Sequence, residues 1–232
     1  GSAERVVAEA VTGADGLASF GAVRPGAYRA RYRLPSDAYG FTAGVAETAN
    51  GFGISPPLSI QSGESFLAAA GLSRYGSISG VVFADADYDG LRGQAEGGVA
   101  ATVTLRDGAG RAVAQTTAGA DGSYAFARLF SGTYTLAFAL PDGYAFTKNR
   151  DDAPSFNSDV PETKAAQADT AALFLPMGEE LLVDVGAYRT AAVSGSVWQD
   201  VGASGRYAAG NPPLSGVAVV LLRDGEPYAQ TL

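Results

Sequence analysis

The chain carries the stretch Asp85-Ala86-Asp87-Tyr88-Asp89-Gly90-Leu91-Arg92-Gly93-Gln94-Ala95-Glu96 between two segments with the composition of β-strands. The stretch matches the calcium-loop pattern D-x-D-x-D-G followed by five residues and a glutamate. Its flanks, residues 77–83 and 99–105, are rich in β-branched and apolar residues and predict strands. The loop therefore joins two strands, and the helix pair of a calcium-sensor protein is not expected here.

The spacing of the acidic residues fits the needs of a hard cation, which takes six to eight oxygen ligands. Asp85, Asp87 and Asp89 stand at positions 1, 3 and 5 of the loop, Leu91 can offer its carbonyl, and Glu96 can supply two oxygens. Without a cation, these four carboxylates repel one another. The pattern predicts a Ca²⁺ site, and the alternative is a solvated acidic turn between strands.

Composition favours an all-β protein and restricts the partners. The 232 residues include Gly 31, Pro 11, Tyr 11 and Phe 11, as expected for many short strands joined by turns. The hydrophobic share of 47 % is enough to form a core. A net charge of −8 argues against binding to nucleic acid or anionic membrane surfaces and suits a divalent cation.

Missing residue types narrow the chemistry. With Cys 0 and His 0, the chain has no disulfide, no thiolate metal site and no histidine base. Paired carboxylates can hydrolyse glycosides, but the acids here stand at metal spacing and no nucleophile motif is present. We therefore expect no enzyme. No apolar run approaches the ~20 residues of a membrane span. We expect the native protein to be longer at both ends, because Gly1-Ser2 is typical of a cloning remnant.

The chain repeats itself with offsets of 106 (119 − 13) and 115 (193 − 78) residues, which set a period near 115. Residues 13–20 recur as residues 119–126, and residues 78–85 recur as residues 193–200. This period is longer than that of solenoid repeats, so each unit is a whole domain. The predicted division is a C-terminal part of a first repeat in residues 1–73, a complete repeat in 74–190 and an N-terminal part of a third in 191–232.

Within the complete repeat, apolar residues alternate with period two. Tyr134, Leu136 and Phe138 share one face of a predicted strand, and small or polar residues share the other. Turn dipeptides such as Asp107-Gly108 and Asp121-Gly122 separate such segments. Six or seven short strands with these turns predict an antiparallel β-sandwich.

These motifs in this order resemble the B-type repeats of serine-aspartate repeat adhesins, which are calcium-binding relatives of the collagen-adhesin B domain. The order is Gly-x-Val-Phe, the acidic loop, Val-Thr-Leu-x-Asp, Ala-Asp-Gly-x-Tyr-x-Phe, Gly-x-Tyr-x-Leu-x-Phe and a closing Val-Asp-x-Gly-x-Tyr. The resemblance implies tandem prealbumin-like (Ig-like) antiparallel β-sandwich repeats. It also implies an extracellular place at a bacterial cell surface, in a stalk whose partners are neighbouring repeats and calcium.

The resemblance extends the predicted metal set. The family carries Asp-Ser-Asp after its Phe-Thr strand, where this chain has Asn157-Ser158-Asp159. Asp159 matches, whereas Asn157 is a weaker donor, and the nearby Asp151 and Asp152 match no fixed position. The closing Asp184 fits the pattern and either binds metal or caps a turn. The complete predicted set is Asp85, Asp87, Asp89, Leu91, Glu96, Asp159 and Asp184.

The two partial copies depart from the pattern. In the third copy the loop begins with Asp200, but Gly202, Ser204 and Asn211 replace the other acids, so no calcium is expected there. In the first copy Ala69 stands in place of Asp184. Some relatives form a Lys–Asn isopeptide bond from the first strand. The available lysines, Lys148 and Lys164, lie in a late loop, so we expect none.

Two functions remain at this point. The leading one is a non-catalytic, calcium-stiffened stalk repeat of a bacterial cell-surface adhesin. The alternative is a carbohydrate- or protein-binding β-sandwich module of a larger secreted protein. Such a module exposes aromatic residues in its loops, but Phe52, Tyr88 and Phe156 do not cluster in the sequence.

The two partial copies also predict head-to-tail self-association. The third copy reaches Thr231, which aligns with Thr116, whereas the first copy starts at Arg5, which aligns with Arg111. One partial copy therefore supplies the strands that the other lacks, and an unpaired apolar sheet face is unfavourable by itself. Partial disorder of residues 1–30 and 205–232, or a truncated fold that is stable alone, are the alternatives.

Overall fold

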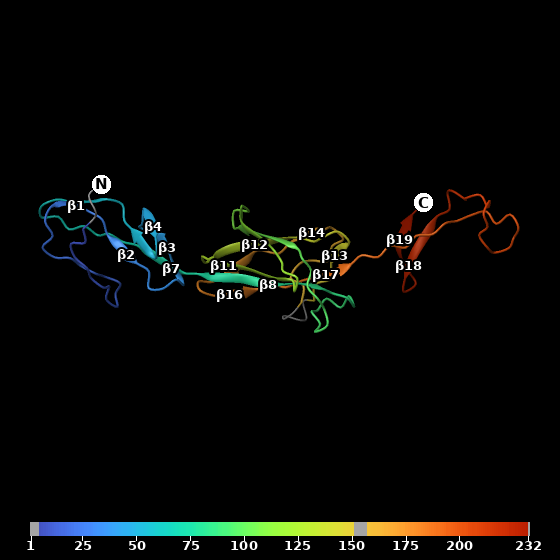
Figure 1. Cartoon of the computed structure of the whole chain (residues 1–232), viewed down its shortest axis with the longest axis horizontal. Helices are drawn as coiled ribbons and strands as arrows, with labels where there is room; N and C mark the ends of the chain where they lie inside the picture. The colour runs from blue at the N-terminus through green and yellow to red at the C-terminus, as the bar shows by residue number, and fades with distance from the viewer. Residues whose placement is uncertain (1–4, 151–156, 232) are drawn as a thin grey trace. The chain divides into compact units, whose positions relative to one another are not determined.

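The computed structural model describes residues 5–150 and 157–231, and this part of the chain consists of strands, turns and loops without a helix. The chain divides into two compact units, Gly1–Arg189 and Thr190–Leu232 (Figure 1). Because the described residues form no helix, none can offer the long apolar helix that would cross a membrane. The prediction of an all-β chain is confirmed.

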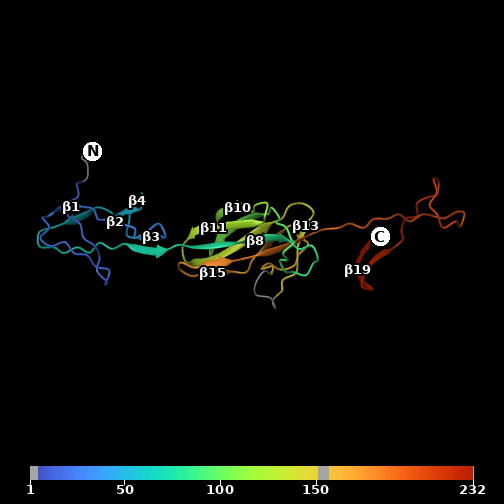
Figure 2. The ribbon, with the colours of Figure 1, turned by 60° about the horizontal axis from the view of Figure 1, so that its bottom comes forward.

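Two five-stranded sheets make up the central repeat (Figures 1 and 2). One sheet has the order β10-β9-β12-β14, with β15 also paired to β12, and the other has the order β11-β8-β17-β13, with β16 also paired to β8. The bounds in the first sheet are β9 (Thr102–Asp107), β10 (Ala112–Thr117), β12 (Gly132–Ala139), β14 (Gln167–Asp169) and β15 (Leu173–Leu175). Those in the second are β8 (Gly76–Ala84), β11 (Ser123–Leu129), β13 (Tyr144–Phe146), β16 (Glu180–Leu182) and β17 (Val185–Arg189).

The predicted sandwich is present, with one feature that the sequence pattern did not indicate. β8 pairs in parallel with both β16 and β17, whereas the other ladders of the central repeat are antiparallel. Glu180 pairs with Ser77 and Val185 pairs with Val82, so β16 and β17 have the same register against β8. The parallel ladder is interrupted at residues 183–184, between the two strands. The first and last strands of the repeat therefore lie side by side, which brings the loop after β8 close to residues near β17.

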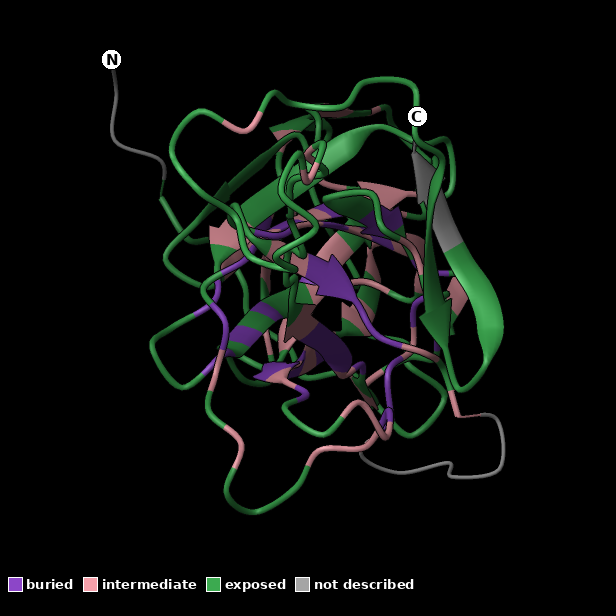
Figure 3. Cartoon of the chain, turned by 90° about the vertical axis from the view of Figure 1, so that its right-hand side faces the viewer, coloured by how far each residue is buried: buried purple, intermediate pink, exposed green. Residues whose placement is uncertain are grey.

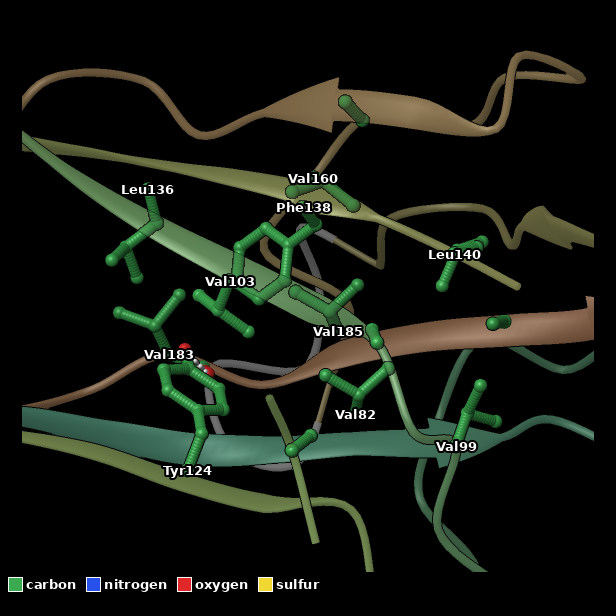
Figure 4. Packing of buried hydrophobic residues seen from close by; sticks show 14 of the residues in the cluster. Val82, Val99, Val103, Tyr124, Leu136, Phe138, Leu140, Val160, Val183 and Val185 are labelled. Atoms are coloured by element: carbon green, nitrogen blue, oxygen red, sulfur yellow. Dashed lines mark hydrogen bonds between the residues drawn. The ribbon is translucent and has the colours of Figure 1, made fainter. Parts of the chain in front are cut away.

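The core lies between the two sheets. Leu136 and Phe138 on β12 are 0 % and 1 % exposed, as their alternation predicts, and Tyr134 packs at the edge of the same cluster. Figure 4 shows side chains from both sheets meeting, and Figure 3 colours the chain by how far each residue is buried. The cluster comprises Ile78, Val82, Val99, Ala101, Val103, Leu105, Ala118, Tyr124, Phe126, Leu136, Phe138, Leu140, Phe146, Val160, Ala168, Leu175, Val183, Val185 and Ala187.

The first copy repeats the strand register of the central one. Gly26 pairs with Ile60 as Gly132 pairs with Leu175, and Tyr39 pairs with Arg74 as Tyr144 pairs with Arg189. Its strands are β1 (Gly26–Tyr28), β2 (Arg31–Arg33), β3 (Tyr39–Ala43), β4 (Glu47–Ala49), β5 (Phe52–Ile54), β6 (Leu58–Ile60) and β7 (Gly71–Arg74). Among described residues 5–75, those that are buried are Gly40, Gly53 and Ser55, so this copy has no apolar core of its own.

The second unit repeats the front of the domain. β18 (Val219–Arg223) and β19 (Glu226–Thr231) form a hairpin that corresponds to β9 and β10. A bridge between Trp198 and Pro213 repeats the one between Phe83 and Gly98. No residue of 190–228 is buried, so neither flanking copy forms the core that the central repeat has.

Candidate metal centre

Asp85 begins the acidic loop directly after β8 and is 1 % exposed. Its Oδ1 accepts a hydrogen bond from the Asp89 N–H at 3.1 Å, and its Oδ2 accepts one from the Gly90 N–H at 2.9 Å. The hydroxyl of Thr147 also donates to Oδ2. These three donors fix the position of the buried carboxylate.

Three carboxylates gather at the start of the loop. One oxygen from each of Asp85, Asp87 and Asp89 lies within 4.8 Å of the others. Oδ1 of Asp87 accepts a hydrogen bond from the Asp89 N–H at 3.2 Å, and Oδ1 of Asp89 accepts one from the Leu91 N–H at 2.7 Å. The loop folds around its own acids, and the resulting group of hard oxygen donors matches what Ca²⁺ binds.

Gly90 makes the turn that brings these acids together. Its φ is +83°, in the region that favours glycine. A Cβ at this position would lie 2.7 Å from the Lys148 carbonyl oxygen, so the turn also packs closely against the loop after β13. The next residue, Leu91, forms a β-bridge with Asn157. The Asn157 amide donates to the Arg150 carbonyl within the loop after β13, so the bridge to Leu91 is the contact that joins the two loops.

Glu96 lies outside the cluster of three. Its Oε1 accepts a hydrogen bond from the Ala86 N–H and its Oε2 one from the Gly93 N–H, each at 2.8 Å. Both oxygens therefore close the loop on itself in this structure. The expectation that Glu96 and the Leu91 carbonyl complete a calcium shell stays a prediction.

Tyr88, at the tip of the loop, fixes it to the sandwich. Its hydroxyl donates to Glu162, and its ring meets the Tyr188 ring edge-on with centroids 4.9 Å apart. The Lys148 ammonium lies 5.4 Å from the Tyr88 ring centroid. This tyrosine is therefore engaged within the domain, as is Phe52, which lies under the Arg31 guanidinium in the first copy. The third loop aromatic, Phe156, lies outside the described residues.

Asp159 and Asp184 form a second acidic pair, which is connected through the backbone. The Asp159 N–H donates to the Asp184 carbonyl at 2.8 Å, and the Asp184 N–H donates to Oδ2 of Asp159 at 2.9 Å. Arg92, from the acidic loop, lies 3.7 Å from Oδ2 of Asp184. Burial, together with the nearby Asp184 charge, raises the pKa of Asp159, although the Asp184 N–H opposes the shift.

The predicted residues thus divide into three groups. Asp85, Asp87 and Asp89 are brought together, Glu96 closes the loop beside them, and Asp159 pairs with Asp184. Asp151 and Asp152 lie outside the described residues. Sequence reasoning missed Thr147, whose buried hydroxyl contacts Asp85; the available signal was its place after the Phe-Thr strand, which the first copy repeats as Thr42.

The third copy keeps the turn but not the charges. Oδ2 of Asp200 accepts a hydrogen bond from the Gly205 N–H, as Oδ2 of Asp85 does from Gly90. The N–H groups of Gly205 and Ser204 lower the pKa of Asp200. Ser204 stands where the central loop has Asp89, and its hydroxyl reaches Oδ1 of Asp200 at 3.3 Å. The same loop backbone therefore forms around one carboxylate instead of three.

A family model agrees with this geometry. The model described as SdrD B-like domain matches residues 76–186, the segment that holds both sheets and the acidic loop. Residues 76–186 form a B-type repeat. Among curated proteins, serine-aspartate repeat-containing protein F of Staphylococcus epidermidis is 32 % identical over 148 residues, which are 62 % of this chain and 9 % of that protein. Protein E of Staphylococcus aureus is 28 % identical over 159 residues, which are 67 % of this chain and 13 % of that protein.

More distant similarities run beyond the B-type repeat. Colossin-A of Dictyostelium discoideum is 28 % identical over 262 residues, which cover 98 % of this chain and 2 % of that protein. The chain thus spans a small part of the curated relatives that it matches. The solved Bacillus anthracis TIE protein aligns with 77 % of this chain and 28 % of its own, at TM-score 0.36 and 17 % identity. The Streptococcus agalactiae minor pilin GBS52 aligns with 75 % of this chain and 87 % of its own, at TM-score 0.34 and 11 % identity.

Proposed function

We propose that this chain is a segment of the stalk of a bacterial cell-surface adhesin, in which Ca²⁺ stiffens the central B-type repeat. The observation that carries the proposal is the group formed by Asp85, Asp87 and Asp89, with one oxygen of each within 4.8 Å of the others. Membership of residues 76–186 in the B-type family supports it. The role is structural rather than catalytic, because the acids serve a metal and no histidine or cysteine is present to act as base or nucleophile.

Calcium stiffens the repeat by fixing a loop that contacts segments distant in sequence. The acidic loop follows β8, and its Leu91 and Arg92 already contact Asn157 and Asp184 from the end of the repeat. A cation held by Asp85, Asp87 and Asp89 removes the repulsion that otherwise favours opening of this loop. Binding to the folded state alone then raises the free energy of unfolding.

Calorimetric titration with Ca²⁺ tests the proposal, using the whole chain after treatment with a chelator. We expect heat of binding from the unmodified chain and its loss in Asp87→Ala, which removes an exposed ligand without disturbing the core. Glu96→Ala should weaken binding as well. Asp200→Ala is the matched control, because its loop has the same turn without the other acids. Absence of Ca²⁺ binding to the unmodified chain would refute the proposed function.

We propose the division into three repeats with boundaries at 73/74 and 190/191. The equal strand registers of the first and central copies support the first boundary, and the separate compact unit from Thr190 supports the second. The location outside the cell follows from the same proposal, since the staphylococcal relatives are serine-aspartate repeat proteins. The binding-module alternative has less support, because Phe52 and Tyr88 contact neighbours within their own repeats.

Head-to-tail association of the flanking copies remains a proposal. Both carry exposed apolar side chains, among them Val11 and Phe20 in the first copy and Val219 and Leu221 in the third. In the central repeat the equivalent strands cover one another. Sedimentation velocity across a concentration series tests it: a rising mean mass supports association, and a constant monomer mass contradicts it.

A further inference from the structure

Tyr75 is the single residue between β7 of the first copy and β8 of the central repeat. Its N–H donates to the Ala38 carbonyl of the first copy at 2.9 Å. Its ring lies against the Phe130 ring of the central repeat, with centroids 4.9 Å apart and planes inclined by 32°. One side chain in the connection therefore contacts both repeats.

Arg128 of the central repeat also contacts both Tyr75 and the first copy. Its guanidinium carbon lies 4.4 Å from the Tyr75 ring centroid, and its Nη1 donates to the Asp37 carbonyl at 3.1 Å. A guanidinium above an aromatic ring is attracted by the electrons of the ring face. Arg128 thus binds both the connection and the turn before β3, although it belongs to β11 of the central repeat.

The backbone at Arg128 has an unusual conformation. Its φ is +58°, unusual for a residue other than glycine, and it lies at the β-bulge between Phe126 and Leu129. Bulges turn a side chain away from its regular direction. The first copy has the same feature, because the corresponding Ala22 has φ +54°, but a methyl group cannot make these contacts. The positive φ is present in both repeats, whereas the arginine is present only at this junction.

Gly40 and Tyr75 both differ from the residues at the corresponding positions of the central repeat. A Cβ on Gly40 would lie 2.2 Å from the Tyr75 hydroxyl and 2.8 Å from Phe130, so Tyr75 fits only because residue 40 is glycine. In the central repeat the corresponding positions hold Ala145 and Thr190. Glycine at position 40 thus occurs with the large Tyr75, whereas Ala145 occurs with the smaller Thr190. Such complementarity is expected of a packed interface and not of a passive linker.

We propose that the end of the central sandwich around Arg128 and Phe130 is a docking surface for the preceding repeat, which it holds through Tyr75 as one rigid segment. The partner that it fits is a B-type repeat with glycine at the position of Gly40 and tyrosine at the connection. The inference extends the proposed stalk role. It can be tested apart from that role, because the junction is measured both with Ca²⁺ and with chelator.

Distance measurement between two spin labels tests the junction directly. The chain has Cys 0, so Ser59→Cys in the first copy and Ala109→Cys in the central repeat, both exposed, give two specific labelling sites. We expect one narrow distance distribution in the whole chain. Tyr75→Thr and Arg128→Ala should broaden it at least twofold. Arg31→Ala, which removes a cation from the Phe52 ring within one repeat, should leave it unchanged.

A broad distribution in the unmodified chain, or a narrow one in both Tyr75→Thr and Arg128→Ala, overturns the proposal. A second comparison guards against effects on folding alone. Gly40→Ala should lower the melting temperature when Tyr75 is present and have a much smaller effect when combined with Tyr75→Thr, which recreates the pair Ala145 and Thr190. Equal effects of Gly40→Ala in both backgrounds would show that Tyr75 does not depend on Gly40, and would also overturn it. Loss of Ca²⁺ binding with a narrow distribution would refute only the calcium role.

Discussion

The Asp184 carboxylate accepts a hydrogen bond from the Val81 N–H at 2.8 Å, in the gap between β16 and β17. The Asp184 side chain thereby supplies an acceptor for a β8 N–H group at the point where the parallel ladder is interrupted. The Asp184 backbone is held in turn by Asp159, through both its N–H and its carbonyl. The two roles expected for Asp184, metal binding and the capping of a turn, both stay predictions, and the role visible in this structure is that of an acceptor for a strand N–H of β8.

Asp184→Ala should therefore destabilise the central repeat without any metal present. It leaves the partly buried Val81 N–H without this acceptor, which costs about 1–3 kcal/mol. Urea denaturation in chelator measures the change. Asp169→Ala is the control, because its contact with Arg106 at 3.6 Å is an exposed ion pair worth about 0–1 kcal/mol. Equal losses in the two variants would show that the hydrogen bond from the Val81 N–H to Asp184 contributes no more than an exposed ion pair.

Gly80→Ala tests the close approach of the same segment. A Cβ on Gly80 would lie 1.8 Å from the Val183 carbonyl oxygen, so β8 or the turn between β16 and β17 must move. Overpacking of this kind costs about 1–3 kcal/mol or more. Gly97→Ala is the control, because a Cβ there meets nothing within 4 Å. Thermal unfolding should show a clear fall for Gly80→Ala and little change for Gly97→Ala; the reverse order would contradict the packing described.

The sequence was sufficient to predict the strands whose alternation is local. β12 shows the period of two in its own residues, with Leu136 and Phe138 buried, and the acidic loop is recognisable from its spacing. Parallel pairing of β8 with β16 and β17 was not predictable in this way. Glu180 and Ser77 are far apart in the chain, and a short strand carries no local mark of its partner.

The same limit applies to the site and to the junction. The repeated Phe-Thr motif marks Thr147 in the sequence, but its contact with Asp85 follows only from a fold that places the two residues side by side. The acidic spacing predicts Glu96 as a ligand, but it could not show that both of its oxygens accept hydrogen bonds from backbone N–H groups in this structure. Nothing in the neighbouring sequence of Tyr75 indicates its contact with Phe130, which depends on the fold.

Acid should weaken the hairpin of β9 and β10 through Asp107. Hydrogen bonds from the Arg111 side chain, and from backbone N–H groups, lower the pKa of Asp107 below its ordinary value. A carboxyl with a lowered pKa in the folded state stabilises that state above the unfolded pKa. This contribution is lost as pH falls through the folded pKa. Stability should therefore decline on acidification below about pH 4, partly because of this residue.

Asp107→Asn should reduce that decline, and Arg111→Met should reduce it as well, since it removes the partner but keeps the carboxyl. Thermal unfolding between neutral pH and about pH 3, in chelator, gives the slopes. The effect should be small, because the pair is at the surface and salt screens it. Unchanged slopes in both variants would show that this pair does not contribute to the acid sensitivity of the chain.

Removal of calcium should lower the melting temperature of the central repeat. A ligand that binds only the folded state adds RT ln(1 + [L]/Kd), which is ~2.7 kcal/mol for a Kd near ~10 μM at ~1 mM Ca²⁺. For a domain of this size, that corresponds to a shift on the order of 10 °C. Differential scanning calorimetry with Ca²⁺ and then with chelator measures it. Asp87→Ala should abolish the shift, because Asp87 belongs to the cluster of three carboxylates. Asp200→Ala should keep the shift, because the loop of the third copy has Ser204 where the central loop has Asp89 and is not expected to bind calcium. A shift that disappears only in Asp200→Ala would place the metal in the third copy instead.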